Sequence, residues 1–168
     1  GGLMGHGIAK VSARAGWDVA LREVSDEKLD KGIGMIEKRL GRAVEKGKLE
    51  QVDADAIRGR SNGTTDYGEL DDCDLVIEAM TEDHDGKLAM GAEVDAIVKP
   101  EAVLATNTSS LPVINQAAST SRPDRFLGLH FFNPAQVMPL LEVVQTVTTS
   151  EETLALGNEF GAQLGKTV

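Results

Sequence analysis

GGLMGHGIAK (residues 1–10) opens the chain, and its glycines decide how the following residues are interpreted. Gly2 and Gly5 have the spacing of the second and third glycines in the pattern G-x-G-x-x-G. The first glycine of that pattern would fall one residue before the chain begins. Apolar residues then recur at helical spacing as far as Ala15, and Gly16 is well placed to end a helix. The opening is therefore predicted to be a glycine turn that leads directly into a helix.

A strand and a terminal acid follow the glycine turn. The segment DVALRE (18–23) is predicted to be a strand, and Glu23 lies 21 residues after Gly2. In dinucleotide sites one glycine lets the backbone approach a pyrophosphate, and the next, here Gly5, lets helix and strand pack closely. The acid that ends the following strand binds ribose hydroxyls. This register predicts a dinucleotide site, and the acid favours NAD because it would repel the additional phosphate of NADP.

Helical and strand-like segments alternate along the remaining chain. A long amphipathic helix capped by Ser25 is predicted over residues 25–49, and a short helix over 53–60 turns back from it. Strands are predicted at DLVIEAM (74–80, buried on both faces), AVLATN (102–107), RFLGLHFF (125–132) and LLEVVQTV (140–147), with the start of one more strand at KTV (166–168). Helices are predicted at 85–98, 111–119 and 150–164, and the segment SNGTTDYGELDDCD (61–74) is turn-rich. The alternation predicts an α/β fold with a doubly wound, mostly parallel sheet in one domain, residues 1–168.

Composition excludes several classes of protein. With 168 residues, of which 41% are hydrophobic and 26% charged, the chain is typical of a soluble globular domain. The formal net charge of -10 argues against a nucleic-acid-binding surface. No apolar run approaches the roughly 20 residues needed for membrane insertion, and no signal peptide is evident. The single cysteine, Cys73, fits a reducing compartment, and no metal site is predicted because no Cys/His cluster has ligand spacing.

A second group of polar residues follows the later strands. Asn107, Ser109 and Ser110 come directly after a predicted strand, at the edge where α/β sheets bind ligands. His130 lies in an apolar run and Glu142 lies in another, 12 residues later. A buried carboxylate bonded to an imidazole would produce a general base. Three alternatives stay open: His130 is a structural histidine, Ser110 only caps a helix, or the 12-residue gap does not bring His130 and Glu142 together.

Taken together, these segments resemble the NAD-binding domain of the L-3-hydroxyacyl-CoA dehydrogenase family. The motifs that carry the resemblance, in the family's order and spacing, are GGLMGHGIA (1–9), DLVIEAMTED (74–83), LATNTSSLP (104–112) and HFFNPAQVMPLLEVV (130–144), followed by TSEET and GKT. The resemblance implies a Rossmann-type fold with a helical hairpin after the second strand. It also implies NAD as the cofactor and oxidation of a 3-hydroxyacyl-CoA to the 3-ketoacyl-CoA, as in fatty-acid β-oxidation or short-chain acid metabolism.

The resemblance also implies roles for individual residues. His130 would be the base, Glu142 its orienting partner and Ser109 the group that binds the reacting oxygen of the substrate, with Asn133 nearby. The residues implied to contact the cofactor are Gly2, Leu3, Met4, Gly5, Glu23, Glu82, Lys87, Asn107 and Ser109. Coenzyme A would contact Lys46 and Arg39 on the helical hairpin. Two positions depart from the family pattern: Glu23 replaces a common Asp, and Arg39 replaces a small polar residue.

Family members also contain more than these residues. An apolar first strand precedes the glycines at the centre of the sheet, and a helical domain follows GKTV, closes over the substrate and forms a homodimer. Both are predicted to be missing from this chain, so the fragment alone is expected to be inactive. A cytoplasmic location is expected, or a mitochondrial or peroxisomal one in a eukaryote. The alternatives are a dehydrogenase of a hydroxy or sugar acid without coenzyme A, and a non-catalytic nucleotide-binding fragment.

Overall fold

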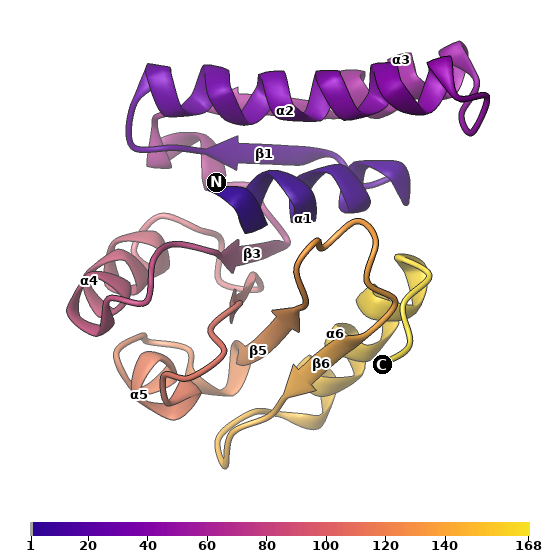
Figure 1. Cartoon of the computed structure of the whole chain (residues 1–168). Helices are drawn as coiled ribbons and strands as arrows, with labels where there is room; N and C mark the ends of the chain where they lie inside the picture. The colour runs from indigo at the N-terminus through magenta and orange to yellow at the C-terminus, as the bar shows by residue number, and fades with distance from the viewer. Residues whose placement is uncertain (1) are drawn as a thin grey trace. The chain divides into compact units, whose positions relative to one another are not determined.

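A computed structural model describes residues 2–168, which form two compact units (Figure 1). Unit 1 comprises the residues up to Asp66 together with Asn133–Val137, and unit 2 comprises Tyr67–Phe132 together with Met138–Val168. Each unit contains parallel strands connected by helices, so the predicted α/β class is confirmed. No helix formed by these residues is long and apolar enough to cross a membrane.

Unit 1 is a two-stranded parallel sheet packed against three helices. Its elements are α1 (Leu3–Arg14), β1 (Val19–Arg22), α2 (Asp26–Glu45), α3 (Gln51–Gly59) and β2 (Ser61–Thr64). The predicted helical hairpin is formed by α2 and α3, which are linked by an ion pair of 2.7 Å between Arg58 Nε and Glu37 Oε1. Ser25 caps α2 as predicted, because its Oγ accepts from the amide of Lys28. The core of this unit is formed by the three helices and β1, and it buries Ala9, Ala13, Leu21, Ile36, Leu40, Ala54 and Ile57.

The strand β2 is not predicted from the sequence, which indicates only that the segment 61–74 is turn-rich. The sequence SNGT has no apolar residue and little preference for a strand. It is nevertheless extended because it pairs in parallel with β1, from Val19 opposite Ser61 to Arg22 opposite Thr64. Gly63 lies under helix α2, where a Cβ would be 2.8 Å from a methyl group of Leu29. Pairing and close packing therefore override the local preference.

Unit 2 is built on a four-stranded sheet in the order β3-β4-β5-β6. The first three strands are parallel, and β6 is antiparallel to β5. The elements are the 3-10 turn η1 (Tyr67–Leu70), β3 (Leu75–Glu78), α4 (His84–Asp95), β4 (Val103–Thr106), α5 (Val113–Ala118), the 3-10 turn η2 (Pro123–Arg125), β5 (Phe126–Phe131), β6 (Leu141–Val144) and α6 (Glu151–Gln163).

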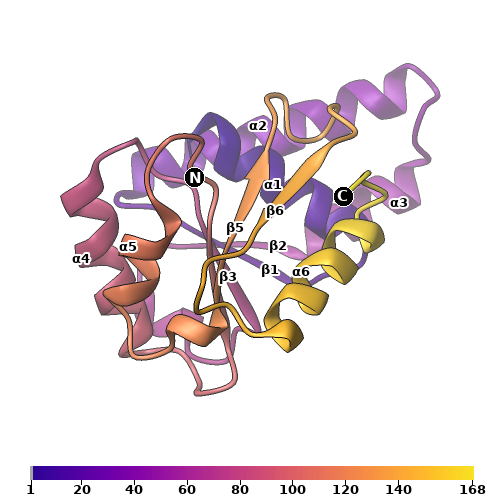
Figure 2. The same cartoon turned by 90° about the horizontal axis from the view of Figure 1, so that it is seen from below.

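Helices cover both faces of this sheet, as the doubly wound prediction requires (Figure 2). On one face, Leu104 and Phe126 pack against Val94 of α4 and Ala117 of α5. On the other face α6 lies directly on the strands, because a Cβ at Gly157 would be only 2.5 Å from Leu127. Glycine in α6 thus lets this helix approach the sheet more closely than a larger residue would.

One prediction about the strands needs correction. The run at 74–80 is predicted to be buried on both faces, yet Leu75, Val76 and Ile77 of β3 are only partly buried. The reason is that, within residues 2–168, β3 is an end strand of its four-stranded sheet and pairs only with β4.

The predicted start of a further strand at KTV is confirmed as a single parallel bridge. Thr167 pairs with Leu140, and it exchanges backbone hydrogen bonds with Pro139 (2.8 Å) and Leu141 (2.9 Å).

A buried ion pair joins the loops at the amino ends of β4 and β5. Arg122 Nε lies 2.6 Å from Asp95 Oδ1 at the end of α4, and the two side chains are 10% and 11% exposed. The guanidinium also donates to the carbonyls of Lys99 and Ala102. Burial by itself would raise the pKa of Asp95, but hydrogen bonds from Ser121 and Arg122 outweigh burial and lower the pKa below its usual value.

Replacing Asp95→Asn should lower the free energy of unfolding by about 3 kcal/mol, because a buried guanidinium loses its counter-charge. Urea denaturation at neutral pH measures the effect. The pKa of Asp95 is lower in the folded chain than in the unfolded chain. The charged carboxylate therefore stabilises the fold fully when the pH is above its pKa in the unfolded chain, and this stabilisation is lost as the pH falls through its pKa in the folded chain. The difference between the two proteins should therefore shrink below about pH 4.

Asp72→Asn is the matched control. Asp72 pairs with Lys99 in the same unit, but its side chain is 97% exposed, so its loss should cost less than about 1 kcal/mol. An Asp95→Asn variant no less stable than this control would refute the assignment of Asp95 and Arg122 as a stabilising buried pair.

Candidate active site

The parallel strands of unit 2 end at one edge of the sheet, where most of the predicted catalytic residues lie. Glu78 is the last residue of β3, Thr106 of β4 and Phe131 of β5. Asn107 connects these ends, because its amide donates to the carbonyl of Glu78 (2.9 Å) and its Oδ1 accepts from the amide of Phe131 (2.8 Å). The backbone amide and the side-chain oxygen of Asn107 therefore hold the ends of β3 and β5 together.

His130 and Glu142 lie directly opposite each other in the antiparallel pairing of β5 with β6. The distance from His130 Nδ1 to Glu142 Oε2 is 2.7 Å, so the possibility that the two residues do not touch is wrong. An ionised carboxylate can only accept a hydrogen bond. In the neutral imidazole Nδ1 therefore carries the hydrogen, and Nε2 has the lone pair that can accept a proton.

The two members of this pair differ in exposure. The His130 side chain is 19% exposed and that of Glu142 is 52% exposed. The expectation of a buried carboxylate is therefore wrong, since β6 is the last strand of its sheet and leaves Glu142 open on one side. The ring of Phe132 packs beside the imidazole, with 4.6 Å between the ring centroids. The imidazole is thus sheltered while its partner faces solvent.

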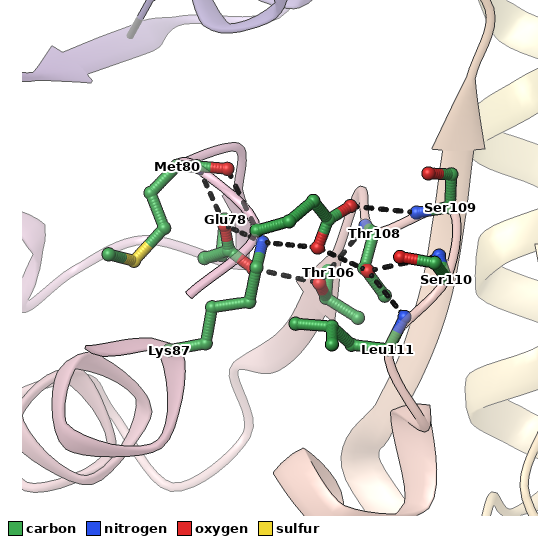
Figure 3. A network of polar contacts seen from close by, with 9 residues as sticks. Glu78, Met80, Lys87, Thr106, Thr108, Ser109, Ser110 and Leu111 are labelled. Carbon is green, nitrogen blue, oxygen red and sulfur yellow. Dashed lines mark hydrogen bonds and ion pairs between the residues drawn. The ribbon is translucent and has the colours of Figure 1, made fainter. Parts of the chain in front are cut away.

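The turn that carries Ser109 (Figure 3) is held by Glu82, which follows β3 in the sequence. Glu82 Oε2 accepts from Thr108 Oγ1 (2.7 Å), and Oε1 accepts from the amide of Ser109 (3.1 Å). Burial raises the pKa of Glu82, but these two hydrogen bonds, followed by the charge of Lys87, outweigh burial and lower the pKa. Ser109 itself is exposed. Its hydroxyl can therefore be reached by a small molecule.

The alternative in which Ser110 caps the following helix is wrong. The cap position of α5 is Pro112, and the turn is closed instead by Thr108, whose Oγ1 accepts from the amide of Leu111 (3.0 Å). A serine or threonine that accepts from an amide three residues ahead is a common way to satisfy a turn. The threonine of NTSS, rather than its second serine, has this role.

Lys87 is buried, with 2% of its surface exposed. Its Nζ donates to both carboxylate oxygens of Glu78 (2.7 and 2.9 Å) and to the carbonyl of Met80 (3.4 Å), as Figure 3 shows. The same Nζ lies 3.7 Å from Glu82 Oε2. An ammonium group has three hydrogens. All of them have acceptors within the protein, so Lys87 organises the carboxylates of this site.

Glu78 is a site residue that the sequence pattern did not single out. It is 6% exposed and also accepts from Thr106 Oγ1 (2.7 Å) and from the amide of Met80 (2.6 Å). A signal was present, because a carboxylate at the end of an apolar strand must find partners. The identity of those partners depends on the neighbouring strand and on α4, which spacing in the sequence does not reveal.

The glycine turn leads into a helix as predicted. Helix α1 begins at Leu3 after Gly2, and within residues 2–168 its N-terminus has no side-chain cap and no acid in the first turn. Amide groups at such an end attract anions. The close packing expected at Gly5 is not found among the described residues, since a Cβ there would meet no atom within 4 Å. The close contact lies at Gly7, where a Cβ would be 2.8 Å from Gln136 Oε1.

The other predicted cofactor residues of unit 1 lie near the start of α1 and the end of β1. Leu3 is exposed and Met4 is partly buried. Glu23 directly follows β1, where the sequence predicted the end of the strand, and it is 8% exposed. Its Oε2 accepts from the amide of Val24 at 3.3 Å. The acid is thus held close to its own backbone at the end of the strand.

The two residues predicted to bind coenzyme A occupy different parts of α2. Lys46 is exposed at the C-terminal cap of the helix. Arg39 is partly buried and lies near helix α1. Burial, followed by the charge of Arg39, lowers the pKa of Lys10, and burial is also the main reason that the pKa of His6 is lowered. Arg39 thus contributes to a positive region along α1, whereas Lys46 faces solvent.

Asn133 completes the set of predicted catalytic residues. It is exposed and begins the segment of unit 1 that follows β5. Within residues 2–168 no group of three or more histidine, cysteine or acidic side chains could hold a metal ion.

The fold, the glycine turn and the acid after the following strand define a dinucleotide-binding class of α/β domain. Comparison with known families is more specific: the family model described as "3-hydroxyacyl-CoA dehydrogenase, NAD binding domain" matches residues 1–168. The chain belongs to this family.

Relatives with known names agree with this assignment. The chain is 47% identical over 169 residues to a 3-hydroxybutyryl-CoA dehydrogenase of Mycobacterium tuberculosis, and 45% identical over 166 residues to a probable enzyme of that name from Deinococcus radiodurans. Each match covers 99% of this chain and 59% of the relative. The crystal structure of (S)-3-hydroxybutyryl-CoA dehydrogenase from Ralstonia eutropha matches with a TM-score of 0.96 and 41% identity, over 98% of this chain and 58% of that one.

Removing the acceptor from His130 should change its tautomer. In a Glu142→Ala variant Nδ1 loses the carboxylate that holds its hydrogen, so the population with the hydrogen on Nε2 should increase. Nitrogen-15 NMR of the histidine rings measures this directly, and the ring of His84 serves as an internal reference. An unchanged His130 tautomer would show that Glu142 does not control the ring.

Proposed function

We propose that this chain is the NAD-binding part of an enzyme that oxidises an L-3-hydroxyacyl-CoA to the 3-ketoacyl-CoA. The observation that carries the proposal is the hydrogen bond between His130 and Glu142, at the same sheet edge as the exposed Ser109. A proton acceptor and a hydroxyl donor at the ends of adjacent strands suit an alcohol that must lose a proton. The 3-hydroxybutyryl-CoA dehydrogenases among the relatives support this substrate class.

The residues present fit NAD. The first-turn amides of α1 would bind the pyrophosphate. The space beside Gly2 is open among the described residues, and a side chain at this position would occupy the space that the pyrophosphate needs. Glu23 would accept from the ribose hydroxyls, with Leu3, Met4 and Gly5 nearby. In unit 2 we propose that Glu82, Asn107 and Ser109 contact the cofactor directly, whereas Lys87, which is 2% exposed, would act through the carboxylates that it contacts. When bound, NAD supplies the acceptor for the hydride that leaves the substrate carbon.

The chain's own residues would manage the proton and the reacting oxygen. Nε2 of His130 accepts the hydroxyl proton, because Nδ1 is already committed to Glu142. The carboxylate of Glu142 then stabilises the imidazolium that results and keeps the ring oriented. The hydroxyl of Ser109 would donate to the substrate oxygen, which becomes the carbonyl oxygen of the product, and we also propose that Asn133 contacts substrate or cofactor.

The remaining assignments concern the rest of the substrate and the assembly. Lys46 would bind a phosphate of coenzyme A, since an exposed ammonium suits a phosphate, and Arg39 would assist from the same helix. We also propose that the whole protein is a homodimer in the cytoplasm, where the thiol of Cys73 would stay reduced.

Cofactor choice is tested at Glu23. In a Glu23→Gln variant the isolated chain should bind NAD more weakly and should lose about tenfold or more of its preference for NAD over NADP, because a like charge no longer opposes the additional phosphate. Isothermal titration with both nucleotides measures the two affinities. The control is Glu27→Gln, at an exposed acid in the first turn of α2, which should leave both affinities unchanged. If the unaltered chain binds neither nucleotide, the assignment of NAD fails.

Catalysis is tested in a chimaera in which this chain replaces the matching part of the Mycobacterium tuberculosis relative. The chimaera should oxidise NADH in the presence of acetoacetyl-CoA. His130→Gln should reduce the rate by about a hundredfold or more, because the imidazole that transfers the proton is absent. His84→Gln, at a histidine of α4, is the control and should keep the original rate. Equal rates for the two variants would exclude His130 as the base.

A further inference from the structure

Two carboxylates compete for one buried ammonium group in unit 2. Glu78 accepts two short hydrogen bonds from the ammonium group of Lys87, and the side chain of Glu78 is 5% exposed. Glu82 lies farther away, with 3.7 Å between its Oε2 and the same Nζ, and its side chain is 41% exposed. The ammonium is therefore satisfied by Glu78. Glu82 is left with both oxygens available for Thr108 and Ser109.

Glu78 also reaches the same turn by a second route. Thr106 Oγ1 donates to Glu78 Oε2 (2.7 Å), and it accepts from the amide of Thr108 (3.2 Å). The carboxylate thus fixes the hydroxyl of Thr106 in the orientation that receives the Thr108 amide. The turn is thus held from two sides, through Glu82 and through Thr106. Figure 3 shows Glu78 next to both Lys87 and Thr106.

We propose that Glu78 is a positioning residue. By binding the ammonium group of Lys87, it leaves Glu82 bonded to Thr108 and to the amide of Ser109, and so holds the turn that carries the Ser109 hydroxyl. Without the charge of Glu78, the ammonium turns to the nearest other carboxylate, which is Glu82. Glu82 then leaves the amide of Ser109, and the turn loosens. The low pKa of Glu82 keeps this carboxylate charged at neutral pH, so the competition exists under ordinary conditions.

This inference rests on the proposed function in one respect: the proposed function supplies the substrate that the Ser109 hydroxyl would bind. The hydrogen bond from the Ser109 amide to Glu82 is a property of the chain alone, and it can be measured without cofactor or substrate. Failure of the chain to bind NAD would overturn the proposed function and leave the role of Glu78 intact. Failure of the measurement below would overturn the role of Glu78 and leave NAD binding intact.

The test is solvent exchange of the Ser109 amide, measured by NMR on the nitrogen-15-labelled chain. In Glu78→Gln, which keeps the shape of the side chain but removes its charge, this amide should exchange about tenfold faster, because it loses a charged acceptor. In the double variant Glu78→Gln with Lys87→Met no ammonium remains to attract Glu82. The exchange rate should then return to within about threefold of the original value.

The double variant separates positioning from mere structural support. If Glu78 only stabilised the fold, the double variant would exchange at least as fast as the single one, and that result would overturn the proposal. An unchanged Ser109 rate in Glu78→Gln would overturn it as well. If the single variant does not fold, Lys87→Met and the double variant decide the question: both should protect the Ser109 amide as the original chain does, and loss of protection in either contradicts the proposal.

Asp95→Asn is the matched control for a lost buried carboxylate. It breaks the ion pair with Arg122, at the amino ends of the strands, and lowers stability. The Ser109 amide should keep its exchange rate in this variant under conditions where the chain is folded. A Ser109 rate that rose equally in Asp95→Asn would show that the amide reports only overall stability, which overturns the specific role of Glu78.

Discussion

The balance of charge around the buried ammonium group of Lys87 is the constraint on which the Ser109 turn of the candidate active site depends. A carboxylate that is removed from water is costly unless it is paired and hydrogen-bonded. Glu78 meets this requirement with donors from its own loop, from β4 and from α4. Because Glu78 already binds the ammonium group, Glu82 stays bonded to the turn that carries Ser109.

The second half of the site depends on the direction of one strand. The antiparallel strand β6 places Glu142 directly opposite His130, whereas the other neighbour of β5 is a parallel strand from a different part of the sequence. A shift of the pairing by one residue would turn Glu142 to the opposite face of the sheet. Helix α6 supports the correct register, because Gly157 allows it to pack on Leu127 and Val143.

Much of the fold is predictable because helices and buried strands have local signals. Apolar spacing and the cap at Ser25 predict α2, and the apolar run LVIE predicts β3. The failures have a common physical cause. SNGT becomes β2 only because β1 is available as a partner, and the exposure of β3 and of Glu142 depends on which strands lie at the end of the sheet. Pairing between distant segments leaves no signal in the segments themselves.

The class of the fold follows from residue types and spacing alone. The glycine turn, Glu23, Ser109, His130 and Glu142 could likewise be singled out as candidate site residues, because of their residue types and their places near strand ends. Which of these groups meet depends on the tertiary structure. It joined His130 to Glu142, assigned Lys87 to Glu78, and assigned Glu82 to the Ser109 turn. Hydrogen bonds act over about 3 Å, so their partners are chosen by the folded arrangement of elements and not by distance along the chain.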